Sequence, residues 1–352
     1  MHCNLTKILR IVAPLSKFDS ALPLNTQTVT IEEIKEQTAN ALVKHGAAEW
    51  VAASVASAVA RAEATGNLIC GLYYLESYCT QLRTGRVDGQ VEPVVTRPKP
   101  AAVSVDAKLG FAQPAFERGI AAAVAAAKEN GTATLAVCHS HTCTAMGFFT
   151  EQIAAHGLIG IGMTNAPACV SPPGGTRAVL GTNPIAMAVP RADGTLAFQF
   201  DQSTSAIAIG KIRVAASSGD KIPLGWAVDK DGRPTDDPKA ALEGSLVSAG
   251  GYKGYGFGLM VEVLAAAVTG SLTSTSAPPL KTPEGPPHDL GQFYFLIDPL
   301  VFAGDVFWAR LAQLTESVES QSGARLPGSN SERPSAVDID AALWETVKQL
   351  AA

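Results

Sequence analysis

Apolar and polar positions along this chain recur with two different periods, and the period predicts where helices and strands lie. In the first quarter, apolar residues return every three to four positions, the spacing of an amphipathic helix. The helices predicted there cover residues 31–45, 48–64 and 71–84. Thr30 and Glu33 have the spacing of a capping box at the start of the first helix, and Gly46 ends it. Prolines make residues 91–102 extended, and we interpret them as a linker.

Beyond residue 102, short apolar runs alternate with longer helical patterns. The predicted strands are 134–138, 159–164, 185–189, 196–199 and 293–297. The predicted helices are 114–129, 146–156, 204–217, 238–243, 255–269, 303–319 and 339–350. The turn at Ala192-Asp193-Gly194 joins two strands into a hairpin, so the sheet should be mixed. The helix over 255–269 is almost wholly apolar, which predicts deep burial, and 270–287 is predicted to be an exposed loop.

Composition narrows the class of protein. The chain has 352 residues, 47% of them apolar and 17% charged, and a formal charge of −5. This length predicts two packed lobes. Scattered Lys and Arg argue against a nucleic-acid partner, and every apolar run is too short to span a membrane. Six cysteines without a Cys-x-x-Cys pair favour reduced thiols and a cytoplasmic location, and residues 1–27 are interpreted as a loosely held arm.

The first segment with candidate chemistry is residues 138–143, Cys-His-Ser-His-Thr-Cys, at the end of a predicted strand. With a period of two, His139, His141 and Cys143 project to one side, a geometry that could hold zinc. No fourth ligand stands nearby in the sequence, and strand ends are also where open α/β sheets bind other ligands. A loop that contacts a ligand without metal is therefore preferred, and a surface loop with incidental histidines stays open.

Two glycine-rich loops are candidates for binding an anion. Residues 171–184 cannot form a helix or central strand, and Thr182 and Asn183 there can grip an anion or amide. Residues 250–258 lead into the apolar helix, where Lys253 and free amides favour a phosphate. Residues 250–258 are not a Walker A motif, and residues 157–162 do not match the G-x-G-x-x-G spacing of a dinucleotide-binding loop. A rigid connection or close packing is the alternative reason for these glycines.

Five segments carry a resemblance to a known family. They are residues 139–149, 164–168, 180–186, 225–229 and 250–255. In this order they resemble the malate/L-lactate dehydrogenase-like family, which includes Δ1-piperideine-2-carboxylate/Δ1-pyrroline-2-carboxylate reductases and ureidoglycolate and sulfolactate dehydrogenases. The resemblance implies an α/β (α+β) fold with a non-Rossmann NAD(P)-binding lobe on a mixed, partly antiparallel sheet. It also implies a helical lobe formed by both chain ends, and a homodimer.

The resemblance also sets domain boundaries and cofactor contacts. The domains would be the arm 1–27, the first helical part 28–98, the NAD(P)-binding lobe 99–250, and a mainly helical part 251–352 that completes the helical lobe. The implied cofactor is NADPH, with NADH as the alternative, and no metal is expected. The cofactor contacts would be Thr142, Cys143, Thr144, Ala145, Met146, Asp201, Gln202, Tyr252, Lys253, Arg325 and Gly328.

The chain departs from the family pattern at the proton donor. Family members carry Ser-His-Gly followed by an Arg, with the His as proton donor and the Arg binding the substrate carboxylate. Here Cys70 stands at the His position and Tyr74 at the Arg position. Losing such an acid should slow ketone reduction by about 10²–10⁴-fold. A cyclic imine can enter the site already protonated. The site then mainly has to bind the substrate carboxylate and orient the imine carbon for hydride transfer.

We therefore predict an NAD(P)H-dependent imine reductase that converts Δ1-pyrroline-2-carboxylate or Δ1-piperideine-2-carboxylate to L-proline or L-pipecolate. The candidate catalytic residues are His141, His139, Tyr74 and Cys70. The candidate substrate contacts are Thr182, Asn183 and Tyr73. One alternative is a 2-oxo acid dehydrogenase in which His141 delivers the proton. The others are a paralogue that binds a ligand without turnover and a zinc hydrolase.

Overall fold

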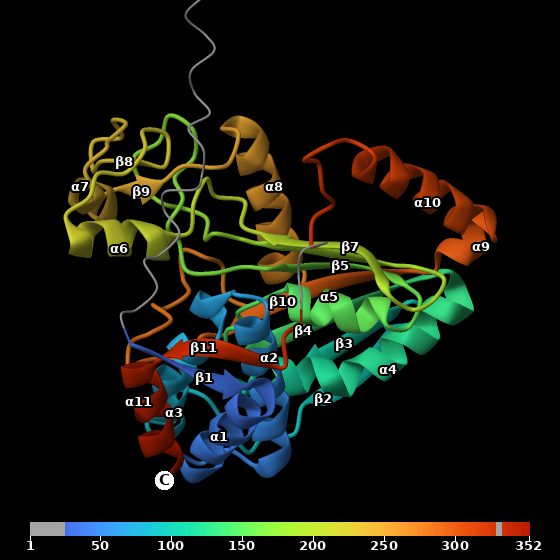
Figure 1. The fold of residues 1–352 in the computed structure, drawn as a ribbon, viewed down its shortest axis with the longest axis horizontal. Helices are drawn as coiled ribbons and strands as arrows, with labels where there is room; N and C mark the ends of the chain where they lie inside the picture. The colour runs from blue at the N-terminus through green and yellow to red at the C-terminus, as the bar shows by residue number, and fades with distance from the viewer. Residues whose placement is uncertain (1–24, 329–332) are drawn as a thin grey trace, which may run out of the picture.

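The computed structural model describes residues 25–328 and 333–352, and its centre is a mixed sheet of seven strands (Figure 1). In sheet order the strands are β2 (Val94–Lys99), β3 (Ala102–Asp106), β4 (Thr132–Ser140), β10 (Leu290–Ile297), β5 (Ile159–Thr164), β6 (Ile185–Pro190) and β7 (Leu196–Gln202). Only β3 and β4 pair in parallel; the other neighbours are antiparallel. The predicted hairpin is the β6–β7 pair, and the mixed sheet is confirmed.

Two helices cover one face of this sheet (Figure 1). They are α4 (Ala112–Asn130) and α5 (Gly147–Ala154). Beneath them Phe116, Phe149 and Tyr294 are fully buried and in mutual ring contact. Helix α4 stops as predicted, because Gly131 takes a left-handed conformation with a φ of +81°.

Other helical elements lie on the opposite face, with α8 and α10 labelled in Figure 1. They are α8 (Tyr252–Glu262), the π-helical turn η5 (Val263–Ala267), α9 (Pro299–Ala303) and α10 (Val306–Glu319). The α8–η5 segment packs on β10 and β5. Helix α10 packs on the β6–β7 hairpin, where Leu311 meets Val189 and Ala197.

The α8–η5 segment is less buried than its composition predicts. Val261 and Ala265 are fully buried against the sheet, but Phe257 is 56% and Val263 is 53% exposed. The prediction of deep burial is therefore wrong for a single chain, because only one side of the segment meets the sheet. Its outward apolar side is left without cover from the residues that the structure describes.

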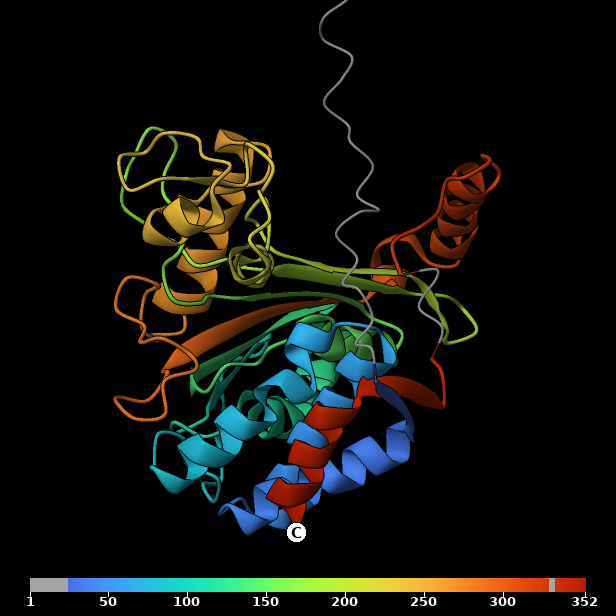
Figure 2. The ribbon, with the colours of Figure 1, turned by 60° about the vertical axis from the view of Figure 1, so that its left-hand side comes forward.

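The helical lobe combines both ends of the chain. It holds α1 (Ile31–Lys44), α2 (Glu49–Ala64), α3 (Leu75–Arg83), α11 (Ala341–Ala351) and a two-stranded sheet of β1 (Thr26–Thr30) and β11 (Ala336–Asp340). Figure 2 shows α11, in red, among the blue N-terminal helices. The predicted capping box is confirmed, since the Thr30 hydroxyl accepts from Glu33 N at 3.1 Å and the Glu33 carboxylate accepts from Thr30 N at 2.9 Å. Most of the predicted arm, residues 1–24, lies outside the described residues.

Two segments differ from their predicted place. Residues 91–102, interpreted as a linker, contain β2, which pairs with β3 at the edge of the large sheet. An edge strand tolerates proline because one of its sides has no ladder to complete. Residues 251–352 were predicted to complete the helical lobe. Among the described helices and strands of this range, β11 and α11 join the lobe, but β10 enters the middle of the large sheet.

A smaller apolar cluster lies next to α8. It is enclosed by α6 (Ile209–Ser218), α7 (Pro238–Glu243), β8 (Ala227–Val228) and β9 (Ser245–Leu246). Helix α6 begins later than predicted, because the Ser205 hydroxyl donates to Ile207 O at 2.9 Å and holds that stretch in a turn. Within the described part of the chain, no helix combines the length and apolar character needed to cross a bilayer.

Candidate active site

Two short 3₁₀ turns carry the residues at which the chain departs from the family pattern. They are η3 (Leu68–Cys70) and η4 (Leu72–Tyr74). The Glu63 carboxylate accepts from Leu72 N at 2.7 Å, and a Cβ at Gly71 would lie 2.0 Å from the same oxygen. Gly71 thus lets Glu63 reach the backbone between the turns, and burial raises the pKa of Glu63 to about 7. This contact fixes the positions of Cys70 and Tyr74.

Three tyrosines form a row that leads from the surface into the protein. Tyr73 and Tyr74 meet edge to face, and Tyr74 stacks on Tyr78, with ring centroids 5.7 Å apart in both pairs. The Lys281 ammonium lies 3.4 Å from the centre of the Tyr73 ring and donates to Tyr73 O at 3.1 Å. Burial raises the pKa of Tyr74 to about 12, so its phenol stays neutral. Lys281 therefore brings a positive charge beside the position where the family pattern has an Arg.

A buried arginine holds the segment that carries Lys281. The Arg86 guanidinium donates at 2.6–2.9 Å to the carbonyl oxygens of Pro279, Thr282 and Pro286, and the residue is 1% exposed. Residues 270–287 are thus anchored at their far end, which the prediction of an exposed loop missed. Nothing in the local sequence signals this contact, because about 200 positions separate Arg86 from its acceptors.

The structure brings together three of the segments predicted to contact the cofactor. At the start of α5, Gly147 N donates to the Asp201 carboxylate at 2.9 Å, and the Gln199 amide donates to Gly147 O at 2.6 Å. On the other side, Gln199 N donates to Pro327 O at 3.1 Å. A Cβ at Gly328 would lie 2.8 Å from Gln199 O, so only glycine fits there. The loop before α5, the end of β7 and the segment ending at Gly328 therefore meet around Gln199.

Asp201 is the charged residue that acts on Cys70, the residue at the position of the family's His. Burial and, next, the Asp201 charge raise the pKa of Cys70 to about 12. Cys143 also reaches about 12, mainly through burial with a smaller contribution from Asp201. Asp201 keeps surface open to solvent, but the atoms crowded around its carboxyl raise its own pKa. The site thus pairs one carboxylate with two thiols that stay protonated at neutral pH.

His141 stands behind the tyrosine row. It is 2% exposed, stacks on His288 at 3.9 Å and contacts Tyr78 at 5.5 Å. Its Nε2 lies 2.7 Å from the side-chain oxygen of Gln81. Burial, followed by His288 and a nearby arginine, lowers the pKa of His141 well below its usual value. An imidazole held neutral in this way is a poor proton donor.

The zinc geometry considered for His139, His141 and Cys143 does not form. His139 has a φ of +52°, which breaks the alternation of β4, and its Nδ1 lies 2.8 Å from the Asp289 carboxylate. His141 faces Gln81, and the Cys143 sulfur contacts the sulfur of Met146 at 3.4 Å. The expectation that His139, His141 and Cys143 project to one side is therefore wrong, because a period of two holds only in a regular strand.

The remaining predicted contacts are split between two environments. Asn183 is fully buried, and its amide donates to Gly258 O at 3.1 Å and to the Glu262 carboxylate at 2.8 Å. These contacts tie the 171–184 loop to α8 and occupy the Asn183 amide. Thr182 is half-buried beside it. Of the predicted cofactor contacts not yet placed, four are exposed in this structure: Gln202, Tyr252, Lys253 and Arg325.

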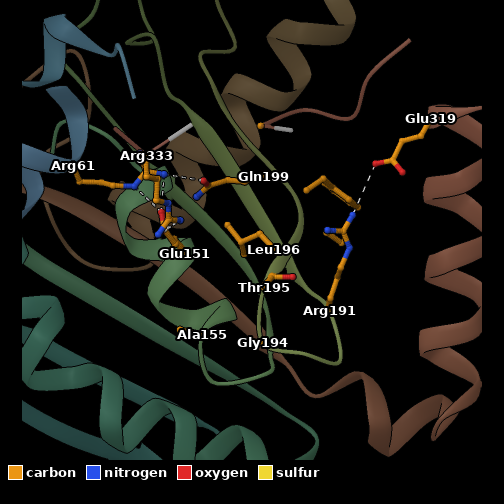
Figure 3. Close-up of a pocket in the computed structure, with 13 residues that line it drawn as sticks. Arg61, Glu151, Ala155, Arg191, Gly194, Thr195, Leu196, Gln199, Glu319 and Arg333 are labelled. Carbon is orange, nitrogen blue, oxygen red and sulfur yellow. Dashed lines mark hydrogen bonds and ion pairs between the residues drawn. The ribbon is translucent and has the colours of Figure 1, made fainter. Parts of the chain in front are cut away.

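A cavity of about 570 Å³ opens where β6, β7, α2 and α5 approach one another (Figure 3). Arg61 and Arg333 both pair with Glu151 inside it, and Arg61 Nε lies 2.8 Å from a Glu151 oxygen. Arg191 approaches Glu319 at 3.9 Å on the other side. The cavity also reaches Gln199 and Gly328, so it adjoins the segments predicted to contact the cofactor. No sequence motif identified its three arginines as site residues.

Residues 29–347 match the sequence profile described as malate/L-lactate dehydrogenase. The chain belongs to this family. Its membership explains the mixed sheet without a dinucleotide-binding glycine loop, and it agrees with the resemblance drawn from the motifs.

Individual relatives extend over nearly the whole chain. The Δ1-pyrroline-2-carboxylate reductase of Ancylobacter novellus is 37% identical over 92% of this chain and 97% of its own length. The (2R)-3-sulfolactate dehydrogenase (NADP+) of Chromohalobacter salexigens is 38% identical over 86% of this chain and 90% of its own. The crystal structure of Δ1-piperideine-2-carboxylate reductase from Pseudomonas syringae superposes with a TM-score of 0.86 at 35% identity, over 92% of this chain and 100% of that one.

Proposed function

We propose that this protein is an NAD(P)H-dependent reductase of a small cyclic imino acid, Δ1-pyrroline-2-carboxylate or Δ1-piperideine-2-carboxylate, and forms L-proline or L-pipecolate. The main support for the proposal is the protonation state of the groups around Cys70. Its thiol and the Tyr74 phenol have pKa values raised to about 12, and His141 is held neutral. These groups suit a substrate that brings its own proton. Relatives at 37–38% identity carry the names of such reductases.

The charges of the site match the charges of that substrate. A protonated cyclic imine is a cation at nitrogen, and the Asp201 carboxylate favours a cation next to it. Lys281 supplies the positive charge that attracts the substrate carboxylate, with the Thr182 hydroxyl as a second anchor. When bound, the nicotinamide supplies a hydride to the imine carbon, and the nitrogen keeps its proton and becomes a neutral amine. The protein's task is then to orient the ring and exclude water.

NADPH is the cofactor that the arginine-lined cavity favours. A phosphate on the ribose is best held by guanidinium groups, and the cavity places three of them beside Gln199 and Gly328. Arg61 and Arg333 share Glu151, whereas Arg191 is only loosely paired with Glu319. Arg191 is therefore the group most free to turn toward a phosphate. The NADP+ named for the sulfolactate dehydrogenase relative agrees with this choice.

Arg191→Ala should raise the KM for NADPH about 10–100-fold and leave the KM for NADH nearly unchanged. The reason is that only NADPH carries the phosphate that this guanidinium would hold. Steady-state rates with each cofactor measure both constants. Arg97→Ala, on β2 at the opposite edge of the sheet, removes a guanidinium that pairs with Glu129; it is the matched control and should change neither constant. Equal losses for both cofactors would assign Arg191 to another part of the site.

The proposed partner is a second copy of the chain, and the proposed location is the cytoplasm. Exposed apolar side chains on the sheet face away from α4 support the homodimer. They come from two separate regions: Phe257, Leu259, Met260, Val263 and Val268 around α8, and Leu300, Val301, Phe302, Val306 and Leu314 on α9–α10. An apolar surface of this extent is unusual on a monomer and is typical of an interface.

A substrate panel tests the function. Rates on Δ1-pyrroline-2-carboxylate or Δ1-piperideine-2-carboxylate should exceed those on pyruvate and oxaloacetate by about 10²–10⁴-fold, because a ketone needs a proton donor that this site lacks. Initial rates of NADPH oxidation, each repeated with NADH, measure this ratio. Comparable rates on a 2-oxo acid would favour the dehydrogenase alternative. NADPH binding without turnover of any substrate would favour a ligand-binding paralogue.

A further inference from the structure

Three side chains of the types that bind metals lie close together at the ends of β3 and β4, apart from the groups around Cys70. One ligand-type atom from each of Asp106, Cys138 and His139 lies within 4.8 Å of the other two. Asp106 and Cys138 are register partners in the parallel β3–β4 pair, so both side chains leave the same face of the sheet.

The conformation of His139 is what completes the cluster. In a regular strand a residue next to Cys138 would point to the opposite face. The φ of +52° at His139 departs from strand geometry and lets the imidazole approach the same side. Its Nδ1 lies 2.8 Å from an oxygen of Asp289, which adds a second carboxylate at the border of the cluster. His139 and Asp289 keep partly exposed side chains, so an ion could reach them from solvent.

We propose that Asp106, Cys138 and His139 form a zinc-binding site, with Asp289 at its border. An oxygen, a thiolate sulfur and an imidazole nitrogen are each established ligands of zinc. Bonds of about 2.0–2.3 Å place ligand atoms roughly 3.5 Å apart, so binding needs to draw these three atoms together by at most about an ångström. Rotation of the Cys138 and His139 side chains supplies that movement. The Cys138 thiol gives up its proton to water and its weak contact to Val105 O at 3.6 Å.

The zinc would act as a clamp on the sheet and take no part in reduction. It would tie the ends of β3 and β4 to the segment before β10, where Asp289 lies. His141, two residues further on, faces Gln81 and Tyr78 instead. This inference is independent of the proposed function, because metal binding is measured without substrate or cofactor.

Cobalt and zinc titrations of the full chain under reducing conditions test the site. We expect one equivalent of Co²⁺ to bind and to give a thiolate-to-cobalt charge-transfer band in the near ultraviolet, which one equivalent of Zn²⁺ abolishes. Cys138→Ser should remove the charge-transfer band. Asp289→Asn should weaken Zn²⁺ binding by about 10–100-fold, the loss typical for a residue that hydrogen-bonds to a metal ligand. His139→Ala and Asp106→Asn remove ligands and should weaken it more than this.

Two control variants test whether Zn²⁺ binding depends on the cluster. Cys169→Ser and His156→Ala change a cysteine and a histidine outside it and should bind Zn²⁺ like the parent protein. Zn²⁺ should also raise the Tm of the parent and not of Cys138→Ser, provided that circular dichroism shows both folded. A charge-transfer band that survives in Cys138→Ser, or no metal bound at micromolar concentration, would overturn the proposal.

Discussion

Asp201→Asn should lower kcat for cyclic imine reduction by about 100–1,000-fold, the loss typical when one preorganised electrostatic group is removed. Asparagine keeps the size of the side chain, and its oxygen can still accept from Gly147 N, so the start of α5 should stay in place. What is lost is the negative charge that stabilises a protonated imine. Steady-state kinetics give kcat and KM, and quenching of NADPH fluorescence gives the cofactor Kd.

Comparing the change in kcat with the change in the NADPH Kd shows whether Asp201 acts on the substrate or on the cofactor. Our assignment requires kcat to fall while the NADPH Kd changes less than about threefold. If the cofactor affinity falls in parallel with the rate, Asp201 contacts the cofactor, as the resemblance alone implied. Asp338→Asn is the matched control, since this exposed carboxylate lies on β11 in the small two-stranded sheet and accepts from the Thr28 hydroxyl. It should leave every constant unchanged.

Phe257→Glu should convert the proposed homodimer to monomers at micromolar concentration. The side chain is 56% exposed in one chain, so the substitution should not disturb folding, but in the dimer it would place an unpaired charge in an apolar interface. A penalty of several kcal/mol would weaken association by about 10³-fold or more. Light scattering after size exclusion measures the mass of both proteins.

A charge elsewhere on the surface should have no such effect. Val214→Glu provides this control, because Val214 is 67% exposed on α6, outside the α8–α10 surface. A monomeric parent protein would show that the homodimer proposal is wrong. A Phe257→Glu protein that stays dimeric would place the interface on another face.

Features that depend on neighbouring residues could be predicted from the sequence. Thr30 and Glu33 are three positions apart and form the capping box at the start of α1. Gly131 ends α4 because an L side chain would strain its left-handed backbone. The β6–β7 hairpin follows from one short turn between two apolar runs. In each case the interacting atoms are brought together by local geometry alone.

Predictions failed where the interacting groups come from distant parts of the chain. The position of His139 was predicted from strand alternation, but this residue has a positive φ and contacts Ser271 and Asp289, which lie 132 and 150 positions away. The apolar composition of α8 predicted burial, but burial depends on what packs outside it. Lys281 contacts Tyr73, 208 positions away in the sequence, and no sequence pattern near either residue predicts this contact.

The sequence by itself determined the family, the mixed α/β class and the absence of the usual His and Arg, because motifs and substitutions are read position by position. Only the tertiary structure decided what surrounds the replacements. It set Asp201 near Cys70, Lys281 beside Tyr74, and His141 neutral behind Tyr78. The physical reason is that charge and pKa depend on distances through space and on burial, and both arise only when separate segments pack together.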